Sequence, residues 1–155
     1  MVESQGSQST QELGYNKIFV SLDSSDQQGH VLDRAIIAAA NNHAMLFIGH
    51  VIDASCIEPT EAVTQETFAQ SERAFRERIA PAVERAESLE GIQGVEVLVK
   101  YGRIRETLKE EMLDVIEPDL IICGARGLSS ISYALLGSIS TYLVRSSKCD
   151  TLVIK

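Results

Sequence analysis

The chain has 155 residues, of which 45% are hydrophobic, enough for the core of a single domain. Its formal net charge of −8 argues against nucleic acid or an anionic membrane as the main partner, because both require clustered Lys and Arg. No apolar run approaches the roughly 18 residues of a membrane span, and the polar N-terminus does not resemble a signal peptide. Because the three cysteines lack metal-ligand spacing and suit a reducing compartment, we expect a cytoplasmic protein.

The N-terminal part predicts a polar leader followed by a strand and a helix. Residues 1–15 are rich in Ser, Gln and Glu, so we expect a disordered leader before a domain that spans residues 16–155. Lys17–Leu22 is a short apolar run of the kind that forms a strand. Gln28–Asn42 carries apolar residues at helical spacing, which predicts a helix with one face on a sheet.

The middle of the chain predicts two further strands around a long helix. Residues 44–52 are almost continuously apolar, as in a strand buried on both faces of a parallel sheet. Residues 60–89 are highly charged but place Phe68 and Phe75 on one face, which indicates an amphipathic helix. Pro81 lies inside this helix and is expected to kink or break it. The alternating residues 95–101 predict a strand nearer the edge of the sheet.

The C-terminal part repeats the alternation of helix and strand. Ile104, Leu108, Met112 and Val115 are spaced to share one helical face. Further strands are predicted over residues 119–123 and 151–154, with a helix over residues 138–145 between them. Strands that alternate with helices predict βαβ units, and therefore one open parallel α/β sheet with helices on both faces. Ligands of such sheets bind beyond the carboxyl ends of the strands.

A glycine pattern follows the strand predicted over residues 119–123. Gly124 and Gly127 are separated by two residues, and after nine more residues comes Gly137, directly before Ser138. Glycine lets backbone N–H groups approach an anion closely, and a helix that begins near Ser138 adds unpaired N-terminal donors and the positive end of its dipole. This stretch therefore predicts a phosphate-binding loop.

This arrangement resembles the nucleotide-binding signature of the universal stress protein family. The resemblance rests on residues 124–127 with Gly137 and Ser138, and it extends to residues 20–25, 50–52 and 119–123. It covers nearly all of residues 17–155. It implies an adenine nucleotide alpha hydrolase-like fold, an open five-stranded sheet in the order 3-2-1-4-5, and a homodimer that holds ATP or AMP. The implied function is that of a nucleotide-dependent regulatory or sensor module in the stress response.

The resemblance also implies which residues bind the nucleotide. The Asp23 carboxylate would accept hydrogen bonds from the ribose hydroxyls, and Val51 would contact adenine. The loop would surround the ribose and the phosphates, largely through backbone N–H groups. The implied nucleotide-binding residues are Ser21, Asp23, Val51, Cys123, Gly124, Arg126, Gly127, Gly137, Ser138, Ile139 and Ser140.

Two features of this region allow other interpretations. Asp23 could instead cap the loop that follows the first strand, and Asp53 is better explained as a loop cap than as a ligand contact. The family often has a small residue or proline where this chain has Ile104, two places after Gly102. That departure could alter the rim of the site.

The chain lacks the catalytic sequence motifs of the common nucleotide hydrolases. It has neither the P-loop signature with its lysine nor a Gly-x-Ser-x-Gly nucleophile elbow, and Arg126 is the only certain cation of the glycine loop. Binding is therefore better supported than catalysis, although a divalent cation such as Mg²⁺ could bridge the phosphates near Ser138. A slow ATP hydrolase and a dimeric interaction module that does not use nucleotide stay open as alternatives.

The histidines and the last strand complete the prediction. His30, His43 and His50 have no metal-ligand spacing, so core or surface positions are expected for them. An apolar strand at the open edge of a sheet invites pairing with a second copy. We therefore expect a homodimer formed through the last strand, with Leu152, Val153 and Ile154.

Overall fold

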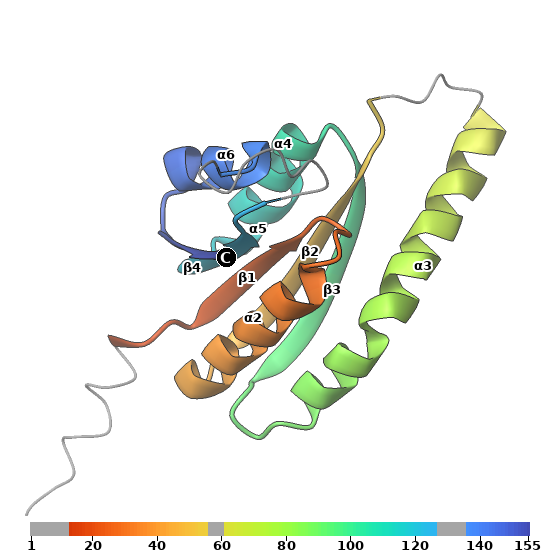
Figure 1. The fold of residues 1–155 in the computed structure, drawn as a ribbon. Helices are drawn as coiled ribbons and strands as arrows, with labels where there is room; N and C mark the ends of the chain where they lie inside the picture. Colours follow the sequence, from red (N-terminus) through yellow and green to blue (C-terminus); the bar gives the residue numbers. More distant parts are fainter. Residues whose placement is uncertain (1–12, 56–60, 127–135) are drawn as a thin grey trace, which may run out of the picture.

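The computed structural model describes residues 13–55, 61–126 and 136–155. These residues form a five-stranded, all-parallel sheet in the order β3-β2-β1-β4-β5, with helices on both faces (Figure 1). The predicted fold and strand order are therefore confirmed, and β3 lies at one edge as the sequence indicated. The strands are β1 (Lys17–Leu22), β2 (Met45–Asp53), β3 (Gly94–Gly102), β4 (Leu120–Gly124) and β5 (Asp150–Ile154).

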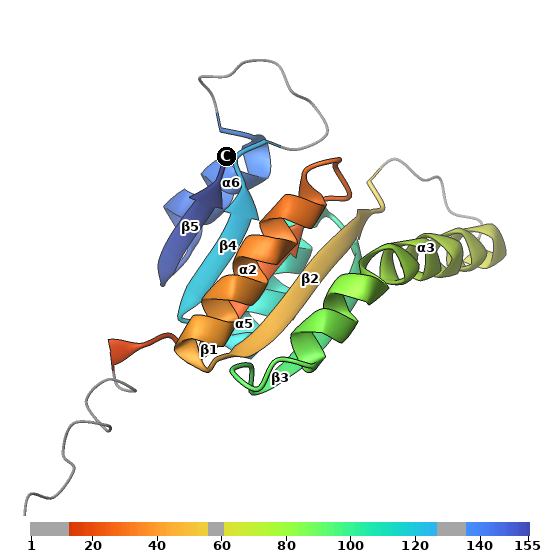
Figure 2. The ribbon, with the colours of Figure 1, turned by 60° about the horizontal axis from the view of Figure 1, so that its bottom comes forward.

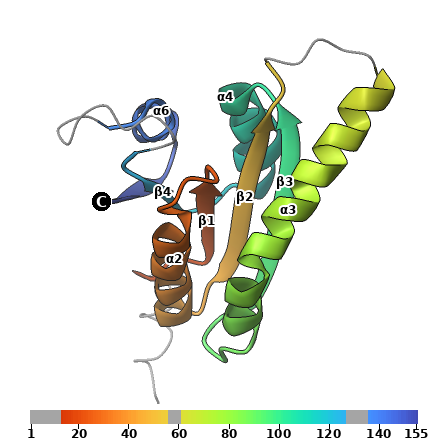
Figure 3. The same cartoon turned by 45° about the vertical axis from the view of Figure 1, so that its right-hand side comes forward.

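The helices divide between the two faces of the sheet (Figure 3). On one face α2 and α3 pack against the sheet, and on the other face lie α6 and a helical segment that consists of α4, the π-helical stretch η1 and α5. Their bounds are α2 (Gln28–Asn42), α3 (Glu61–Glu87), α4 (Ile104–Thr107), η1 (Leu108–Leu113), α5 (Asp114–Ile116) and α6 (Ser138–Ser146). Within the described ranges no helix is long and apolar enough to cross a membrane.

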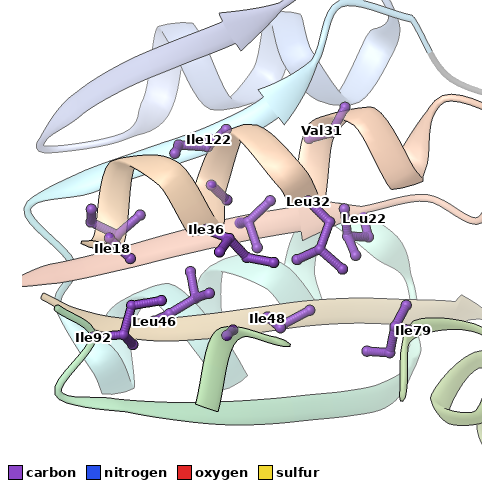
Figure 4. Packing of buried hydrophobic residues seen from close by; sticks show 14 of the residues in the cluster. Ile18, Leu22, Val31, Leu32, Ile36, Leu46, Ile48, Ile79, Ile92 and Ile122 are labelled. Carbon is purple, nitrogen blue, oxygen red and sulfur yellow. The ribbon is translucent and has the colours of Figure 1, made fainter. Parts of the chain in front are cut away.

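The central strand β1 contributes side chains to both hydrophobic clusters. Ile18, Phe19 and Val20 are completely buried. Since successive side chains of a strand point to opposite faces, Ile18 and Val20 pack toward α2 whereas Phe19 joins the cluster under η1 and α6. Figure 4 shows Leu32 and Ile36 of α2 lying over β1 and β2. The core thus fixes the sheet from both sides and holds the ends of its strands in place.

The long helix α3 continues through Pro81. The sequence predicted a kink or a break at this proline, and no break occurs because the helix runs unbroken to Glu87. Figure 2 shows that α3 changes direction along its length. A proline removes one backbone N–H and crowds the preceding turn, which bends a helix without ending it when the flanking turns are packed. Here Phe75, Ile79 and Ala86 are buried on either side of Pro81.

The prediction for Val115 was wrong, because the helix that contains it is not α-helical throughout. Val115 is 71% exposed, whereas Ile116 is buried. The π-helical turns of η1 fit more residues per turn than an α-helix, so the buried face advances by one residue after Met112. The apolar series is therefore Leu108, Met112 and Ile116.

Hydrogen bonds connect residues 15–17 to the last residue of α2, the first residue of β5 and the residue before β4. The backbone N–H of Tyr15 donates to Asn42 Oδ1 over 3.1 Å, and its hydroxyl donates to Asp150 Oδ2 over 2.8 Å. Asp119 accepts the backbone N–H groups of Asn16 and Lys17. Residues 1–12 of the expected leader lie outside the described residues.

Candidate functional site

The carboxyl ends of three neighbouring strands meet the N-terminus of α6 around one cavity of about 670 Å³. These elements lie at the same end of the sheet because all five strands are parallel (Figure 3). Nine of the predicted site residues line this cavity, namely Ser21, Asp23, Val51, Cys123, Gly124, Gly137, Ser138, Ile139 and Ser140. Nucleotide binding by these residues stays a prediction.

Of the other two predicted residues, one does not line the cavity and the other is not described by the structure. Arg126 is half-buried and follows β4 by two residues, but it is not among the residues that line the cavity. Gly127 lies outside the described residues.

The turn after β1 places Asp23 at the edge of the cavity. Its Oδ1 accepts the backbone N–H of Ser25 over 3.0 Å, and Ser24 between them adopts a positive φ of 63°. Asp23 therefore does cap its loop, as one interpretation held. Its second carboxylate oxygen has no partner within the described residues, so the same side chain can also accept hydrogen bonds from a ligand in the cavity.

The other side of the cavity is a helix N-terminus fastened to the end of β4. Gly137 N–H donates to the carbonyl of Ala125 over 2.7 Å, and Ser140 Oγ donates to the carbonyl of Gly137 over 2.9 Å. In the described chain no side chain caps α6. The first-turn N–H groups of Ser138 and Ile139 are therefore open to an acceptor, and together with the helix dipole they favour an anion.

His50 also lines the cavity, although the sequence indicated only a core or surface histidine. The ring is 8% exposed and stacks on Phe75 with a centroid distance of 4.3 Å. Its Nδ1 lies 2.7 Å from the carbonyl oxygen of Leu22 and its Nε2 lies 3.3 Å from Ser24 Oγ. Because a carbonyl only accepts, Nδ1 carries the proton, and in the neutral ring Nε2 accepts from the Ser24 hydroxyl. Burial lowers the pKa of His50, against the opposing effects of the Leu22 carbonyl and the Asp23 charge.

Helix α3 contributes a wall that sequence analysis missed entirely. Ser71, Ala74, Phe75 and Arg78 line the cavity from this helix. Their spacing of three, one and three residues places them on one helical face. That spacing is the feature of the sequence from which this wall could have been found. Any helix residues that pack on a sheet share the same spacing, however. Phe75 was assigned to the core for this reason.

The departure from the family pattern after β3 lies in the cavity wall. Ile104 lines the cavity beside Leu108, and both belong to the hydrophobic cluster that contains Val51. This part of the wall is apolar and suits a flat aromatic ring. Ile104 therefore adds hydrophobic surface next to Val51.

Cys123 is a neutral thiol in the floor of the cavity. It is 3% exposed, and burial, together with the negative charge of Asp23, raises its pKa to about 11. A thiol with such a pKa is protonated at neutral pH and is a poor nucleophile. Among the residues that the structure describes, no group of three or more His, Cys, Asp or Glu is placed to hold a metal ion.

The sequence of this chain matches a known protein family. The model of the universal stress protein family matches residues 14–155. The chain belongs to the universal stress protein family. A relative from Staphylococcus haemolyticus that is assigned to the universal stress proteins is 27% identical over 143 residues, which are 92% of this chain and 86% of the relative. A Staphylococcus aureus (strain USA300) relative with the same assignment is 28% identical over 143 residues, again 92% of this chain and 86% of the relative.

Solved structures of universal stress proteins show the same fold. UspA from Lactobacillus plantarum superposes with a TM-score of 0.81 at 24% identity, covering 92% of this chain and 99% of that one. A universal stress protein crystallised in complex with cAMP superposes with a TM-score of 0.59 at 28% identity, covering 91% of this chain and 97% of that one. The fold of the present universal stress protein is thus shared along almost the whole chain.

Proposed function

We propose that this universal stress protein binds an adenine nucleotide, ATP or AMP, in the cavity of about 670 Å³ and acts as a nucleotide-dependent regulatory module of the stress response in the cytoplasm. The observation that carries the proposal is the meeting of three chemically different surfaces in one cavity. An apolar wall around Val51 would contact the base, the Asp23 carboxylate would accept hydrogen bonds from the ribose hydroxyls, and the N–H groups at the start of α6 would donate hydrogen bonds to the phosphates.

Three further observations support this assignment. The cavity exceeds about 300 Å³, the lower end of the range typical of small-molecule sites, so its volume is compatible with a nucleotide. A relative of the same fold, 28% identical to this chain, has been crystallised with cAMP, which is itself an adenine nucleotide. The glycines that flank the described ends of the loop, Gly124 and Gly137, both line the cavity.

The residues present favour binding over hydrolysis. The buried thiol of Cys123 is protonated, and the unprotonated Nε2 of His50 already accepts from the Ser24 hydroxyl, while Nδ1 donates to the Leu22 carbonyl. Neither group is free to activate a water molecule beside the α6 N-terminus. A divalent cation that arrives with the nucleotide would be held mainly by the phosphates, with the Ser138 hydroxyl as a neighbouring oxygen ligand.

The direct test is to release and identify the bound molecule. The purified protein is denatured, the supernatant is separated by anion-exchange chromatography, and the empty protein is then titrated with ATP and AMP by calorimetry. We expect either co-purified adenine nucleotide or saturable binding. A protein that releases no nucleotide and does not bind ATP at millimolar concentration contradicts the proposal and favours the interaction module that does not use nucleotide.

We also propose that the protein is a homodimer through β5. This strand lies at the edge of the sheet, so one side of its backbone has no partner strand among the described residues, and Leu152 is 43% exposed. Pairing of β5 with its copy across a two-fold axis would satisfy these backbone groups and cover Leu152, with Val153 and Ile154 beside it.

Sedimentation velocity tests the dimer. Leu152→Asp places a charge in the proposed interface without touching the core clusters, so it should convert a dimer into a monomer. Val144→Asp, which changes a residue of α6 that is 47% exposed, serves as the matched control and should leave the mass unchanged. An unaltered mass for Leu152→Asp, or a wild-type monomer, contradicts this interface.

A further inference from the structure

A second cavity, of about 570 Å³, lies beside the first between the N-terminal turn of α2 and helix α3. The two cavities have Ser24 and Arg78 in common, because both residues line both. Ser24 directly follows Asp23, which in the proposed function holds the ribose. The second cavity therefore lies next to the position proposed for the ribose.

The start of α2 offers unpaired backbone donors to this cavity. Gln28 N–H donates to the Ser25 carbonyl over 3.1 Å and Val31 N–H to the Gln27 carbonyl over 3.1 Å, but the N–H groups of Gly29 and His30 have no partner in the described chain. The helix has no side-chain cap and no acidic residue in its first turn. A Cβ added at Gly29 would have nothing within 4 Å, so the space in front of this residue is open. Fifteen residues of helix stand behind these donors with the positive end of their dipole toward the cavity.

A buried amide in the same wall is left without a partner. Gln28 lines the cavity and is only 6% exposed, yet its Oε1 accepts no hydrogen bond from any described residue. A buried polar group of this kind is rarely left unpaired. Because an amide can turn over about its last torsion, Gln28 offers an acceptor or two N–H donors at this point. The unpartnered amide is an observation independent of the helix terminus, and it points to a polar group that completes the site.

Among the described residues that line the second cavity, one cation, Arg78, has no ion-pair partner and can bind such a group. Arg85 is held by Asp33, with 3.0 Å between the guanidinium Nη2 and the carboxylate Oδ1. Arg78 forms no ion pair with a described residue and lies where the two cavities meet. Asp26 is the carboxylate of this lining that is not engaged in an ion pair within the described ranges, and it is exposed to solvent. An anion placed between Arg78 and the Gly29 N–H would meet a guanidinium, a helix N-terminus and the hydroxyl of Ser25.

We propose that this second cavity is a phosphate subsite that extends the nucleotide site and receives a phosphomonoester on the 2′ or 3′ hydroxyl of the ribose. The proposal rests on the proposed function, because it takes Asp23 as the residue beside the ribose. Arg78 supplies the positive charge, the Gly29 N–H and the Gln28 amide supply directed donors, and Ser24 lies where the two subsites join. The site then distinguishes adenosine bisphosphates from AMP.

Calorimetric titration with AMP, adenosine 2′,5′-bisphosphate and adenosine 3′,5′-bisphosphate tests this subsite. One of the two bisphosphates is expected to bind at least about tenfold more tightly than AMP, and the isomer that does so identifies the hydroxyl. Arg78→Gln should abolish this gain, so that the ratio of bisphosphate to AMP affinity, measured in the variant itself, falls to about one. Arg73→Gln is the matched control, since Arg73 is an exposed arginine of the same helix that lines neither cavity. Equal affinities for all three ligands, or a gain that survives Arg78→Gln, overturn the proposal.

An amide-resolved NMR titration with inorganic phosphate separates this proposal from the function on which it rests. If neither AMP nor ATP binds, the proposed nucleotide function fails, and the subsite is judged by phosphate alone. Saturable shifts of the Gly29 and His30 amides that Arg78→Gln removes would support a phosphate site. The absence of such shifts, or equal shifts in both proteins, would contradict it. Circular dichroism of both arginine variants verifies that each is folded.

Discussion

Two walls of the larger cavity, the one made of strand ends and the one on α3, differ in how the fold brings their residues together. One wall is made of strand ends, Asp23 after β1, Val51 in β2 and Gly124 at the end of β4. Another wall is a face of α3, with Phe75 and Arg78. The strand-end wall is assembled by the parallel register of the sheet, whereas the α3 wall depends on how one long helix packs across it.

This difference shows which parts of a site are conspicuous in a sequence. Asp23 and Gly124 interrupt apolar runs, and an interruption of this kind at the end of a predicted strand indicates a ligand-binding rim. Phe75 continues the apolar pattern of its helix, so it looks like any other core residue. Its role in the cavity follows from the 4.3 Å stack with His50, which only the three-dimensional structure contains.

The largest expected effect is the loss of stability and of nucleotide binding when Phe75 of the α3 wall is replaced. Phe75→Ala removes a side chain that is 2% exposed, so the free energy of unfolding should fall by about 3–5 kcal/mol and nucleotide binding should weaken as His50 loses its stacking partner. Urea unfolding and calorimetric titration at a temperature where the variant remains folded measure the two effects.

Phe68→Ala provides the matched comparison on the same helix. Phe68 is 5% exposed and stacks on Tyr101 at 4.4 Å, but it does not line the cavity. This variant should lose stability of the same order and keep its nucleotide affinity. Were Phe68→Ala to weaken binding as much as Phe75→Ala, α3 would support the fold without forming a specific wall of the site.

A smaller effect is expected at the strand-end wall. Asp23→Ala removes the carboxylate proposed to accept the ribose hydroxyls, and a hydrogen bond to a charged group is worth about 1.5–3 kcal/mol. Affinity for ATP should therefore fall by about 10- to 150-fold in a calorimetric titration. Asp53→Ala is the control, because Asp53 also lines the cavity but its Oδ1 already accepts the N–H and hydroxyl of Ser55. Equal losses in the two variants would contradict a special role for Asp23.

The sequence predicted most of the fold because each local signal agreed with the next. β1 and α2 have the predicted bounds, and the bounds of β2 to β5 and α6 are within one residue of the predicted ones. Val115 was misassigned because a π-helical segment has no distinct apolar signature and shifts the buried face to Ile116. Periodicity identifies a helical face only while the number of residues per turn stays constant.

The lining of the candidate site was predictable at the strand ends and at the start of α6, but not at His50 or on α3. His50 was missed because a lone histidine near the end of an apolar strand is indistinguishable from a core residue until the turn after β1 places Ser24 and the Leu22 carbonyl beside its ring. Arg78 was missed because charged residues occur throughout α3, and its neighbourhood at two cavities depends on the packing of α2 against α3. The contacts of His50 with the turn after β1, and the packing of α2 against α3, both join residues that are far apart in the sequence.

The smallest expected effect is a dependence of stability on pH that arises where the two walls meet, at His50. Burial lowers the pKa of this ring below its ordinary value of 6.5, and the Arg78 charge acts in the same direction. The unfolded chain therefore takes up a proton at a higher pH than the folded protein does. The stabilisation is fully present above about pH 6.5 and decreases as the pH falls from there toward the lowered pKa of the folded state.

His50→Gln isolates this contribution, because the glutamine amide can still donate to the Leu22 carbonyl but does not titrate. His30 and His43 are exposed and are present in both proteins, so their effects cancel in the comparison. Urea unfolding at pH 7.5 and pH 5.5 should show a larger loss of stability for the wild type than for the variant. Equal losses in the two proteins would mean that His50 protonates as easily in the folded protein as in the unfolded chain. That result would contradict the interpretation of His50 as a buried, neutral ring between the strand ends and α3.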